Sequence, residues 1–265
     1  MRPSVFVASC VTLLLSLTSC TNVNGGNTAS VTDTIKYEYK TTRFIQANDK
    51  IADSSLLFRS SITYPLVDNK QYALLADSIS AFIRLTTFGG YRTAEEATKA
   101  FVEDCIAQTK GEEGMSMLGW ESIDSISVAC NTPSVVSLRR MHYSYTGGAH
   151  GNPSETYVSF ATSNGKRLKF DDIVEKGRLS ELETINITQL KLSRNIKEQS
   201  TLEESGLFVK GDELALPSSF ALTRKGLLIA YDYYEIACYA DGVVSYIIPF
   251  SKLKGILKDE FILAE

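Results

Sequence analysis

The sequence predicts an α+β fold that consists mainly of antiparallel sheet with helices packed against it. Segments with strand character outnumber helical ones, and no strict strand–helix–strand alternation is present. Short turn motifs separate several of the strand-like segments, which favours antiparallel neighbours. No internal repeat is present in the chain.

The first residues have the pattern of an export signal. Arg2 precedes an apolar stretch, residues 5–17, that is shorter than the about 20 apolar residues of an ordinary spanning helix. Residues 17–20, Leu-Thr-Ser-Cys, resemble a bacterial lipobox, so we expect cleavage of residues 1–19 and lipidation of Cys20. A plain secretory signal with a chance cysteine is the alternative. Acyl chains contribute about 0.8 kcal/mol per buried methylene, so lipid on Cys20 is expected to hold the protein at a membrane. No later segment of the sequence is apolar enough to span a bilayer, so we expect lipid to be the only membrane anchor.

Residues 20–33 are expected to form the lipidated end and a flexible tether, because small polar side chains predominate after Cys20. Thr21-Asn22 lacks the aspartate that retains some lipoproteins at the inner membrane, which favours the periplasmic face of the outer membrane within the cell envelope. Loss of Arg2 with the signal changes the formal charge from −4 to −5. No stripe of Lys and Arg is present, which argues against nucleic-acid binding.

The N-terminal part of the domain, residues 34–140, is expected to form an α+β half. Ile35, Tyr37 and Tyr39 alternate with charged residues, which predicts a half-buried strand. The expected strands are 35–40, 56–62, 123–129 and 135–145, of which the last two pair as a hairpin through Asn131-Thr132-Pro133.

Two helices are expected between the second and third strands, separated by Gly89-Gly90. The first begins near Pro65, and its apolar stripe contains Tyr72, Leu75, Ile79 and Phe82. The second begins at Thr93, because Thr93-Ala94-Glu95-Glu96 is a capping box. Its buried side chains are expected to be Ala97, Ala100, Phe101 and Cys105.

The C-terminal part, residues 141–265, is richer in turn residues. Asn164-Gly165 is a strong hairpin signal because both residues accept positive φ, and residues 180–183, Ser-Glu-Leu-Glu, form another capping box. The expected strands are 156–162, 166–170, 219–223, 227–234 and 243–249; a helix begins at Ser180 with Leu182, Ile185 and Leu190 facing inward, and a short amphipathic helix spans 252–261.

Three cysteines follow Cys20 in the sequence. Cys105, Cys130 and Cys238 have no spacing typical of a metal site. One disulfide with a free thiol is one interpretation; we favour three buried, small apolar side chains.

A glycine cluster surrounds one of only two histidines, in Tyr145-Thr146-Gly147-Gly148-Ala149-His150-Gly151-Asn152. It is followed by a hairpin on Asn164-Gly165-Lys166, by Leu168–Asp172, by Phe220–Thr223, and by Tyr234-Glu-Ile-Ala-Cys-Tyr-Ala-Asp-Gly with Ile247–Ser251. In this order the segments resemble the RsiV-type extracellular domain of unknown function, over Tyr143 to Leu253. That domain also occurs beside the catalytic domain of PdaC-type peptidoglycan deacetylases. The sequence departs from the family at Cys238, where proline is usual.

The resemblance implies an α+β fold in two interlocked halves, similar to a subdomain of the Hsp70 ATPase. RsiV proteins are anti-sigma factors whose outer domain binds lysozyme. Because the signal here begins at Met1, we expect no cytoplasmic sigma-binding segment and no direct control of a sigma factor. PdaC-type deacetylases carry a His-x-x-x-His pair in a separate metal-binding domain, whereas His142 and His150 are eight residues apart.

The glycine cluster and the C-terminal tyrosines supply the candidate binding residues. These are Tyr145, Gly147, Gly148, His150, Gly151, Asn152, Tyr234 and Tyr239. Tyr231, Tyr233 and Tyr246, together with Tyr234 and Tyr239, either form an aromatic platform for glycan or protein or are ordinary strand residues. His150 is either a ligand or base, or a side chain that locks its loop by a hydrogen bond. We favour the second interpretation because no catalytic partner is identifiable.

No catalytic or metal-ligating set is predicted, and no cofactor is expected. A zinc site would need His142, His150 and one of Asp171 or Asp172, a set that we do not favour. Asp171 and Asp172 are adjacent, so on a strand they would point to opposite faces rather than act as a glycosidase pair. Capping of the following turn and helix is the better interpretation of the two acids.

These observations favour a lipid-anchored, non-catalytic envelope protein that binds a cell-wall-related partner. The partner expected from the resemblance is a lysozyme-like muramidase or peptidoglycan itself. Two alternatives stay open at this point: an envelope polysaccharide or peptidoglycan hydrolase or deacetylase that uses His150, and a structural or assembly lipoprotein.

Overall fold

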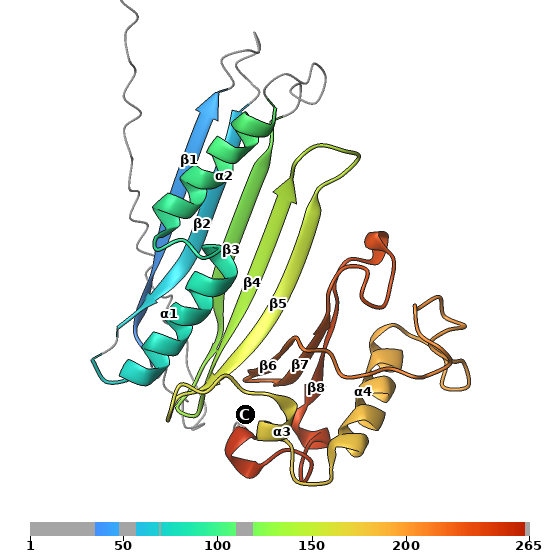
Figure 1. Ribbon diagram of the computed structural model, residues 1–265. Helices are drawn as coiled ribbons and strands as arrows, with labels where there is room; N and C mark the ends of the chain where they lie inside the picture. Colours follow the sequence, from blue (N-terminus) through green and yellow to red (C-terminus); the bar gives the residue numbers. More distant parts are fainter. Residues whose placement is uncertain (1–34, 48–56, 69, 110–118, 263–265) are drawn as a thin grey trace, which may run out of the picture.

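The computed structural model describes residues 35–47, 57–68, 70–109 and 119–262, and it has the mixed α+β fold that the sequence predicts (Figure 1). A five-stranded sheet in the order β1-β2-β3-β4-β5 carries two helices, and a three-stranded sheet in the order β6-β7-β8 lies beside it. The predicted signal peptide, Cys20 and the tether lie outside the described residues. No helix in the described ranges is long and apolar enough to cross a membrane.

The large sheet is antiparallel except at its centre. β1 with β2, β3 with β4, and β4 with β5 are antiparallel pairs, whereas β2 and β3 run parallel. The predicted hairpin of β3 and β4 is confirmed, with the predicted bounds for β4, whereas β3 and β2 extend beyond the predicted ranges 123–129 and 56–62. The bounds are β1 Tyr37–Ala47, β2 Leu57–Val67, β3 Glu121–Asn131, β4 Val135–Tyr145 and β5 Asn152–Ala161.

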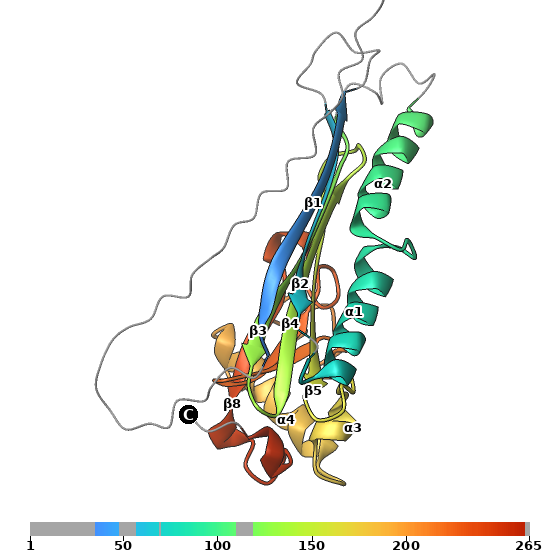
Figure 2. The ribbon, with the colours of Figure 1, turned by 90° about the vertical axis from the view of Figure 1, so that its left-hand side faces the viewer.

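Helices α1 (Ala73–Thr87) and α2 (Ala94–Gln108) cover one face of this sheet (Figure 2). Leu75, Ile79 and Phe82 are buried on α1, as predicted, and pack with side chains of the sheet such as Ile126 and Leu138. This apolar contact forms the core of the N-terminal part. Burial of each such aliphatic side chain stabilises the fold by about 1.5–3 kcal/mol.

The predicted start of the first helix near Pro65 is wrong. Pro65 lies in β2 opposite Tyr39 of β1, and the helix begins only at Ala73. Pairing of β2 with β3 ends at Thr63. Proline has no N–H to donate, and at position 65 the sheet needs no hydrogen bond to β3, so proline is tolerated there.

The predicted cap of α2 is confirmed, but its buried residues differ from the predicted ones. Thr93 Oγ1 accepts a hydrogen bond of 3.1 Å from the Glu96 backbone N–H, while Glu96 accepts from the Arg92 N–H at 3.0 Å. The buried residues are Ala94, Thr98, Val102 and Cys105, whereas Ala97, Ala100 and Phe101 are only half-buried. The helix is therefore rotated by about one position from the predicted orientation, since residues four apart share a face.

The C-terminal part has its own core between a three-stranded antiparallel sheet and helix α4. The hairpin and the last strand are confirmed, although residues 232–234 lie beyond the end of β7. The elements are α3 Phe170–Ile173, α4 Leu179–Ser193, β6 Phe220–Thr223, β7 Gly226–Tyr231 and β8 Val244–Pro249, with 3₁₀ turns η2 Tyr239–Asp241, η3 Phe250–Lys252 and η4 Asp259–Phe261.

Three predicted elements of this part are corrected. Residues 166–170 form a single bridge, Arg167 with Phe160, before the chain turns into α3. The cap predicted at Ser180 is absent because α4 begins one residue earlier, after Arg178. The helix predicted over 252–261 is replaced by η3 and η4, which still place Leu253, Ile256 and Leu257 in the core.

Polar side chains of β4 and β5 join the two sheets. Ser137 Oγ donates a hydrogen bond of 2.7 Å to the Leu222 carbonyl, and the Leu222 N–H donates to Ser159 Oγ at 3.1 Å. The Tyr157 N–H donates to Ser219 Oγ at 2.8 Å. The boundary expected between residues 140 and 141 falls inside β4. The likeness to an Hsp70 subdomain stays a prediction.

The cysteines differ in their surroundings. Cys105 is a buried free thiol, and burial raises its pKa to about 11. Cys130 is buried as well. Cys238 is exposed, which corrects the expectation that all three side chains are buried.

Candidate functional site

The glycine cluster forms the loop between β4 and β5. Gly147 and Gly148 have φ of 93° and 98°, values that side chains with a Cβ rarely adopt. The Tyr145 hydroxyl donates a hydrogen bond of 3.0 Å to the Gly148 carbonyl, which closes the turn. The loop therefore has a defined conformation that is fixed by its own sequence.

Gly151 holds the end of this loop against β4. A Cβ at this position would lie 2.2 Å from Tyr143 Cε2, so the tyrosine ring occupies the space that a side chain would need. The Gly151 carbonyl is placed close to two rings. His150 Nδ1 lies 2.8 Å from it, and the Tyr239 hydroxyl donates to it at 3.2 Å. The second of these bonds connects the loop to η2 of the C-terminal part.

Three rings pack around the Tyr239 ring; we call His150, Tyr233, Tyr234 and Tyr239 the aromatic platform. His150 stacks on Tyr239 with ring centroids 4.4 Å apart and an interplanar angle of 27°. Tyr233 and Tyr234 lie at 5.6 Å and 5.7 Å from Tyr239 in tilted arrangements. His150 and Tyr234 are exposed, and Tyr234 is 54% exposed. Such contacts contribute about 0.5–1.5 kcal/mol beyond area burial.

The backbone of Tyr234 is strained. Its φ is 62°, which is unusual for a side chain with a Cβ and costs roughly 1–3 kcal/mol. Asp232 fixes the start of this turn, because its carboxylate accepts hydrogen bonds from Ser154 Oγ at 2.6 Å, the Glu155 N–H at 2.8 Å and the Tyr233 N–H at 2.9 Å. The carboxylate thus ties the platform to the edge of β5, a role that the sequence did not reveal.

Side-chain contacts also fix η2, which carries Tyr239. The Cys238 thiol donates to Asp241 Oδ2 at 2.9 Å, and Arg194, the residue that follows α4, donates to Oδ1 at 2.5 Å. These two donors, the thiol first, hold the pKa of Asp241 below its usual range. Where the family resemblance implies proline, this chain therefore has a hydrogen-bonded cysteine.

The structure brings most of the predicted residues together. Tyr145, Gly147, Gly148, His150 and Gly151 lie at one connection between strands. Tyr239 reaches this connection from the C-terminal part, and Tyr234 packs on Tyr239. Asn152 is exposed at the first position of β5 and pairs with Ser144.

Tyr231 and Tyr246 do not belong to the platform. Both are buried, and their hydroxyls form hydrogen bonds of 2.9 Å and 2.7 Å with the Asn186 side chain. Burial raises the pKa of Tyr231 to about 12. These two tyrosines stabilise the C-terminal core, whereas Tyr239 contacts the loop and Tyr233 and Tyr234 pack on Tyr239.

A second polar cluster, which the sequence did not reveal, lies on β3 and β4. Asp124 is only 4% exposed, and it accepts hydrogen bonds from Arg140 Nε at 3.0 Å and from the Arg140 terminal nitrogen. His142 Nδ1 lies 3.2 Å from the same carboxylate. A buried carboxylate requires such partners, since an unpaired one costs several kcal/mol. The i, i+2 spacing of Arg140 and His142 could have predicted this cluster, because side chains two residues apart on a strand point to one face.

Of the adjacent acids Asp171 and Asp172, the second caps the start of α3. Asp172 accepts a hydrogen bond of 3.0 Å from the Lys169 N–H at the start of α3 and pairs with Lys166 at 2.6 Å. Among the residues that the structure describes, no group of three or more His, Cys, Asp and Glu side chains is arranged to hold a metal ion.

Two family models match separate parts of the chain. Residues 171–251 match the model described as "Protein of unknown function (DUF3298)", and residues 51–153 match the model described as "Deacetylase PdaC". Peptidoglycan-N-acetylmuramic acid deacetylase PdaC of Bacillus subtilis (strain 168) is 30% identical over 122 residues, which are 45% of this chain and 26% of that protein. The chain thus spans about a quarter of this curated relative's length. The matches support a domain of the DUF3298/PdaC type.

Two solved structures share the fold. A DUF3298 family member from Bacteroides fragilis NCTC 9343 superposes with a TM-score of 0.73 at 20% identity, over 87% of this chain and 96% of that chain. A DUF3298 family protein from Pseudomonas aeruginosa PAO1 superposes with a TM-score of 0.64 at 18% identity, over 88% and 99%. The mixed α+β fold is therefore that of known DUF3298 structures.

Proposed function

We propose that this chain is a non-catalytic binding module of the cell envelope that recognises peptidoglycan through the aromatic platform. The similarity to the deacetylase model and to a protein whose name includes peptidoglycan hints at a cell-wall-related role. The observation that carries the proposal is the convergence of His150, Tyr234 and Tyr239 from two distant segments.

The platform has the chemistry that a glycan strand requires. Ring faces of the exposed His150 and Tyr234 offer apolar contact to the C–H groups of a sugar ring, and tyrosine hydroxyls offer hydrogen bonds at their edges. Hydrogen bonds to the Gly151 carbonyl and to Asp232 hold the rings before a ligand arrives. Binding to a pre-arranged surface avoids part of the entropy that ordering of side chains would cost.

A binding role also agrees with the contacts that the two histidine rings make. His150 Nδ1 lies against the Gly151 carbonyl, and His142 Nδ1 lies against the Asp124 carboxylate. In this proposal His150 locks its loop and adds one ring to the platform. Lipidation at Cys20 and a position at the periplasmic face of the outer membrane form part of the proposal and rest on the sequence pattern of residues 1–22.

The test compares two tyrosine variants of the purified protein. Insoluble peptidoglycan is used in pull-down experiments, and soluble muropeptides are titrated by calorimetry. Tyr239→Ala removes the central ring of the platform and is expected to cost about 2 kcal/mol, roughly 30-fold in affinity. Tyr91→Ala is the matched control, because Tyr91 is 43% exposed and lies in the connection between α1 and α2.

Three results would overturn the proposal. Equal binding of Tyr239→Ala and Tyr91→Ala would exclude the platform as the site. Binding to a lysozyme with none to peptidoglycan would replace the partner by the muramidase that the RsiV resemblance implies. Release of acetyl groups or cleavage of the glycan, lost in His150→Ala at an unchanged melting temperature, would show an enzyme.

A further inference from the structure

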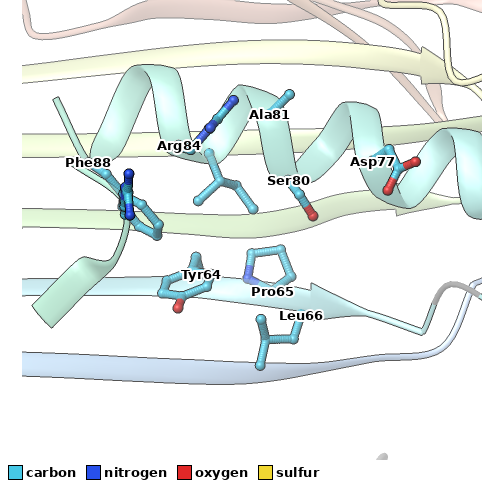
Figure 3. Close-up of a pocket in the computed structure, with 10 residues that line it drawn as sticks. Tyr64, Pro65, Leu66, Asp77, Ser80, Ala81, Arg84 and Phe88 are labelled. Carbon is cyan, nitrogen blue, oxygen red and sulfur yellow. The ribbon is translucent and has the colours of Figure 1, made fainter. Parts of the chain in front are cut away.

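A pocket of about 370 Å³ lies between α1 and the C-terminal half of β2 (Figure 3). β2 is next to the edge strand β1, whereas β5 forms the other edge of the sheet and carries the contacts to the aromatic platform. The pocket is thus a separate feature of the N-terminal part. Its volume is within the range of about 300–1,000 Å³ that is typical of small-molecule sites.

The helix and the strand supply different walls of this pocket. Asp77, Ser80, Ala81 and Arg84 are three and four residues apart on α1, so they lie along one side of the helix. Pro65 and Leu66 form the opposite wall, beyond the point where β2 stops pairing with β3 (Figure 3). The walls therefore place a line of polar groups opposite an apolar surface.

Aromatic side chains close one end of the pocket. The Phe88 ring contacts Tyr64 in a T-shaped arrangement with centroids 5.3 Å apart. Tyr64 is only 8% exposed, and burial raises the pKa of its hydroxyl. Both rings face the same space as Arg92, which follows the Gly89-Gly90 connection.

The charges of the pocket are separated along its length. Arg84 lies toward the Phe88 end, and Asp77 lies toward the other end (Figure 3). Within the described part of the chain, neither the Arg84 nor the Arg92 guanidinium has an ion-pair or hydrogen-bond partner, and the Asp77 carboxylate has none. Arg92, four residues after Phe88, also lines the pocket. Guanidiniums are suited to a carboxylate, because the planar donor fork matches its two oxygens.

We propose that this pocket binds a short peptide with free ends. The peptide carboxylate pairs with Arg84 and Arg92, its ammonium group pairs with Asp77, and its central residue packs on Pro65. Arg84 is seven positions after Asp77 on the helix, which is about 10 Å at a rise of 1.5 Å per residue. A tripeptide spans this distance, since an extended chain covers about 3.3–3.6 Å per residue. This inference is independent of the platform and of its glycan partner.

The test titrates the purified protein with trialanine, N-acetyl-trialanine and trialanine amide, and follows binding by calorimetry and amide chemical shifts. Trialanine is expected to bind with a millimolar or lower Kd, and each blocked form is expected to bind about tenfold more weakly. In the double variant Arg84→Ala with Arg92→Ala, amidation should no longer matter. In Asp77→Asn, acetylation should no longer matter. Arg84→Lys with Arg92→Lys keeps the charge and should retain part of the preference for a free carboxylate.

Two controls separate this inference from the proposed function. Tyr239→Ala is expected to leave trialanine binding unchanged, and the three pocket variants are expected to leave peptidoglycan-glycan binding unchanged, because the two sites are on different elements. The melting temperature should be unchanged in all pocket variants, since the substituted side chains are exposed. No trialanine binding at millimolar concentration, equal affinity for blocked and free forms, or loss of trialanine binding in Tyr239→Ala would overturn the assignment.

Discussion

Substitution of Gly151 by alanine tests how the platform loop is held against β4. The new Cβ would lie 2.2 Å from Tyr143 Cε2 and 2.3 Å from Cζ and the hydroxyl oxygen, whereas ordinary contacts begin at 3.4 Å. The ring must therefore move by about 1.2 Å, the difference between 3.4 and 2.2 Å. Overpacking of this kind costs about 1–3 kcal/mol. For a domain of this size, each kcal/mol lowers Tm by about 2–4 °C.

The control for this variant is Gly148→Ala. A Cβ there has no atom within 4 Å, so its cost comes only from the φ of 98° and is about 1–2 kcal/mol. The two alanine variants are expected to have similar stabilities for different reasons. Only the cost of Gly151→Ala depends on the tyrosine ring.

A double-mutant cycle separates the two causes. Urea unfolding of Gly151→Ala, Tyr143→Ala and the combined variant is expected to give a coupling free energy of about 1 kcal/mol or more, because removal of the ring removes the clash. Gly148→Ala combined with Tyr143→Ala should be additive. An equal cost of Gly151→Ala with and without the ring would refute the steric argument.

Three further predictions follow from buried and charged groups. Asn186→Ala leaves two buried tyrosine hydroxyls without an amide partner and is expected to cost about 2–4 kcal/mol in urea unfolding, whereas Thr188→Ala on the exposed side of the same helix costs under about 0.5 kcal/mol. Lys166 Nζ, and to a lesser degree a backbone N–H, lower the pKa of Asp172, so its contribution to stability is present above the unfolded pKa of about 3.9 and is lost as pH falls through the lower folded pKa. Asp172→Asn should therefore reduce the urea midpoint at neutral pH and have a smaller effect near pH 2; an equal effect at both values would contradict the pairing. Iodoacetamide is expected to modify Cys238 in the folded protein and Cys105 only after unfolding, because Cys105 is buried and its pKa is about 11; mass spectrometry of modified peptides decides this.

Local patterns were sufficient for most strands and for both long helices of the N-terminal part. The hairpin of β3 and β4 could be predicted because Thr132-Pro133 interrupts two β-prone runs. The interpretation of Pro65 failed because proline is compatible with a helix start and with a strand that has lost one neighbour. That loss depends on where β3 leaves β2, which is a long-range property of the sheet.

The sequence predicted the separate segments of the candidate site but not the contacts between them. The glycine cluster marked the loop, and the tyrosine-rich segment marked the second half of the site. The contact of His150 with Tyr239 joins residues that are far apart in the chain, so it depends on the packing of both sheets. Asp232 was missed because its role is to accept N–H and O–H groups from β5 and its own turn, and an isolated aspartate has no distinctive pattern.

The parallel pairing of β2 with β3 affects the order in which the chain assembles. Strands β3, β4 and β5 are consecutive and can pair soon after synthesis, because their loops are short. The pair β1 and β2 is separated from β3 by two helices, so its inner edge has no neighbour until that later strand exists. An unpaired edge can join other chains. We therefore expect nascent chains to be most prone to aggregate before β3 is made, while the inner edge of β2 is unpaired. Pairing of β3 with β2 covers that edge.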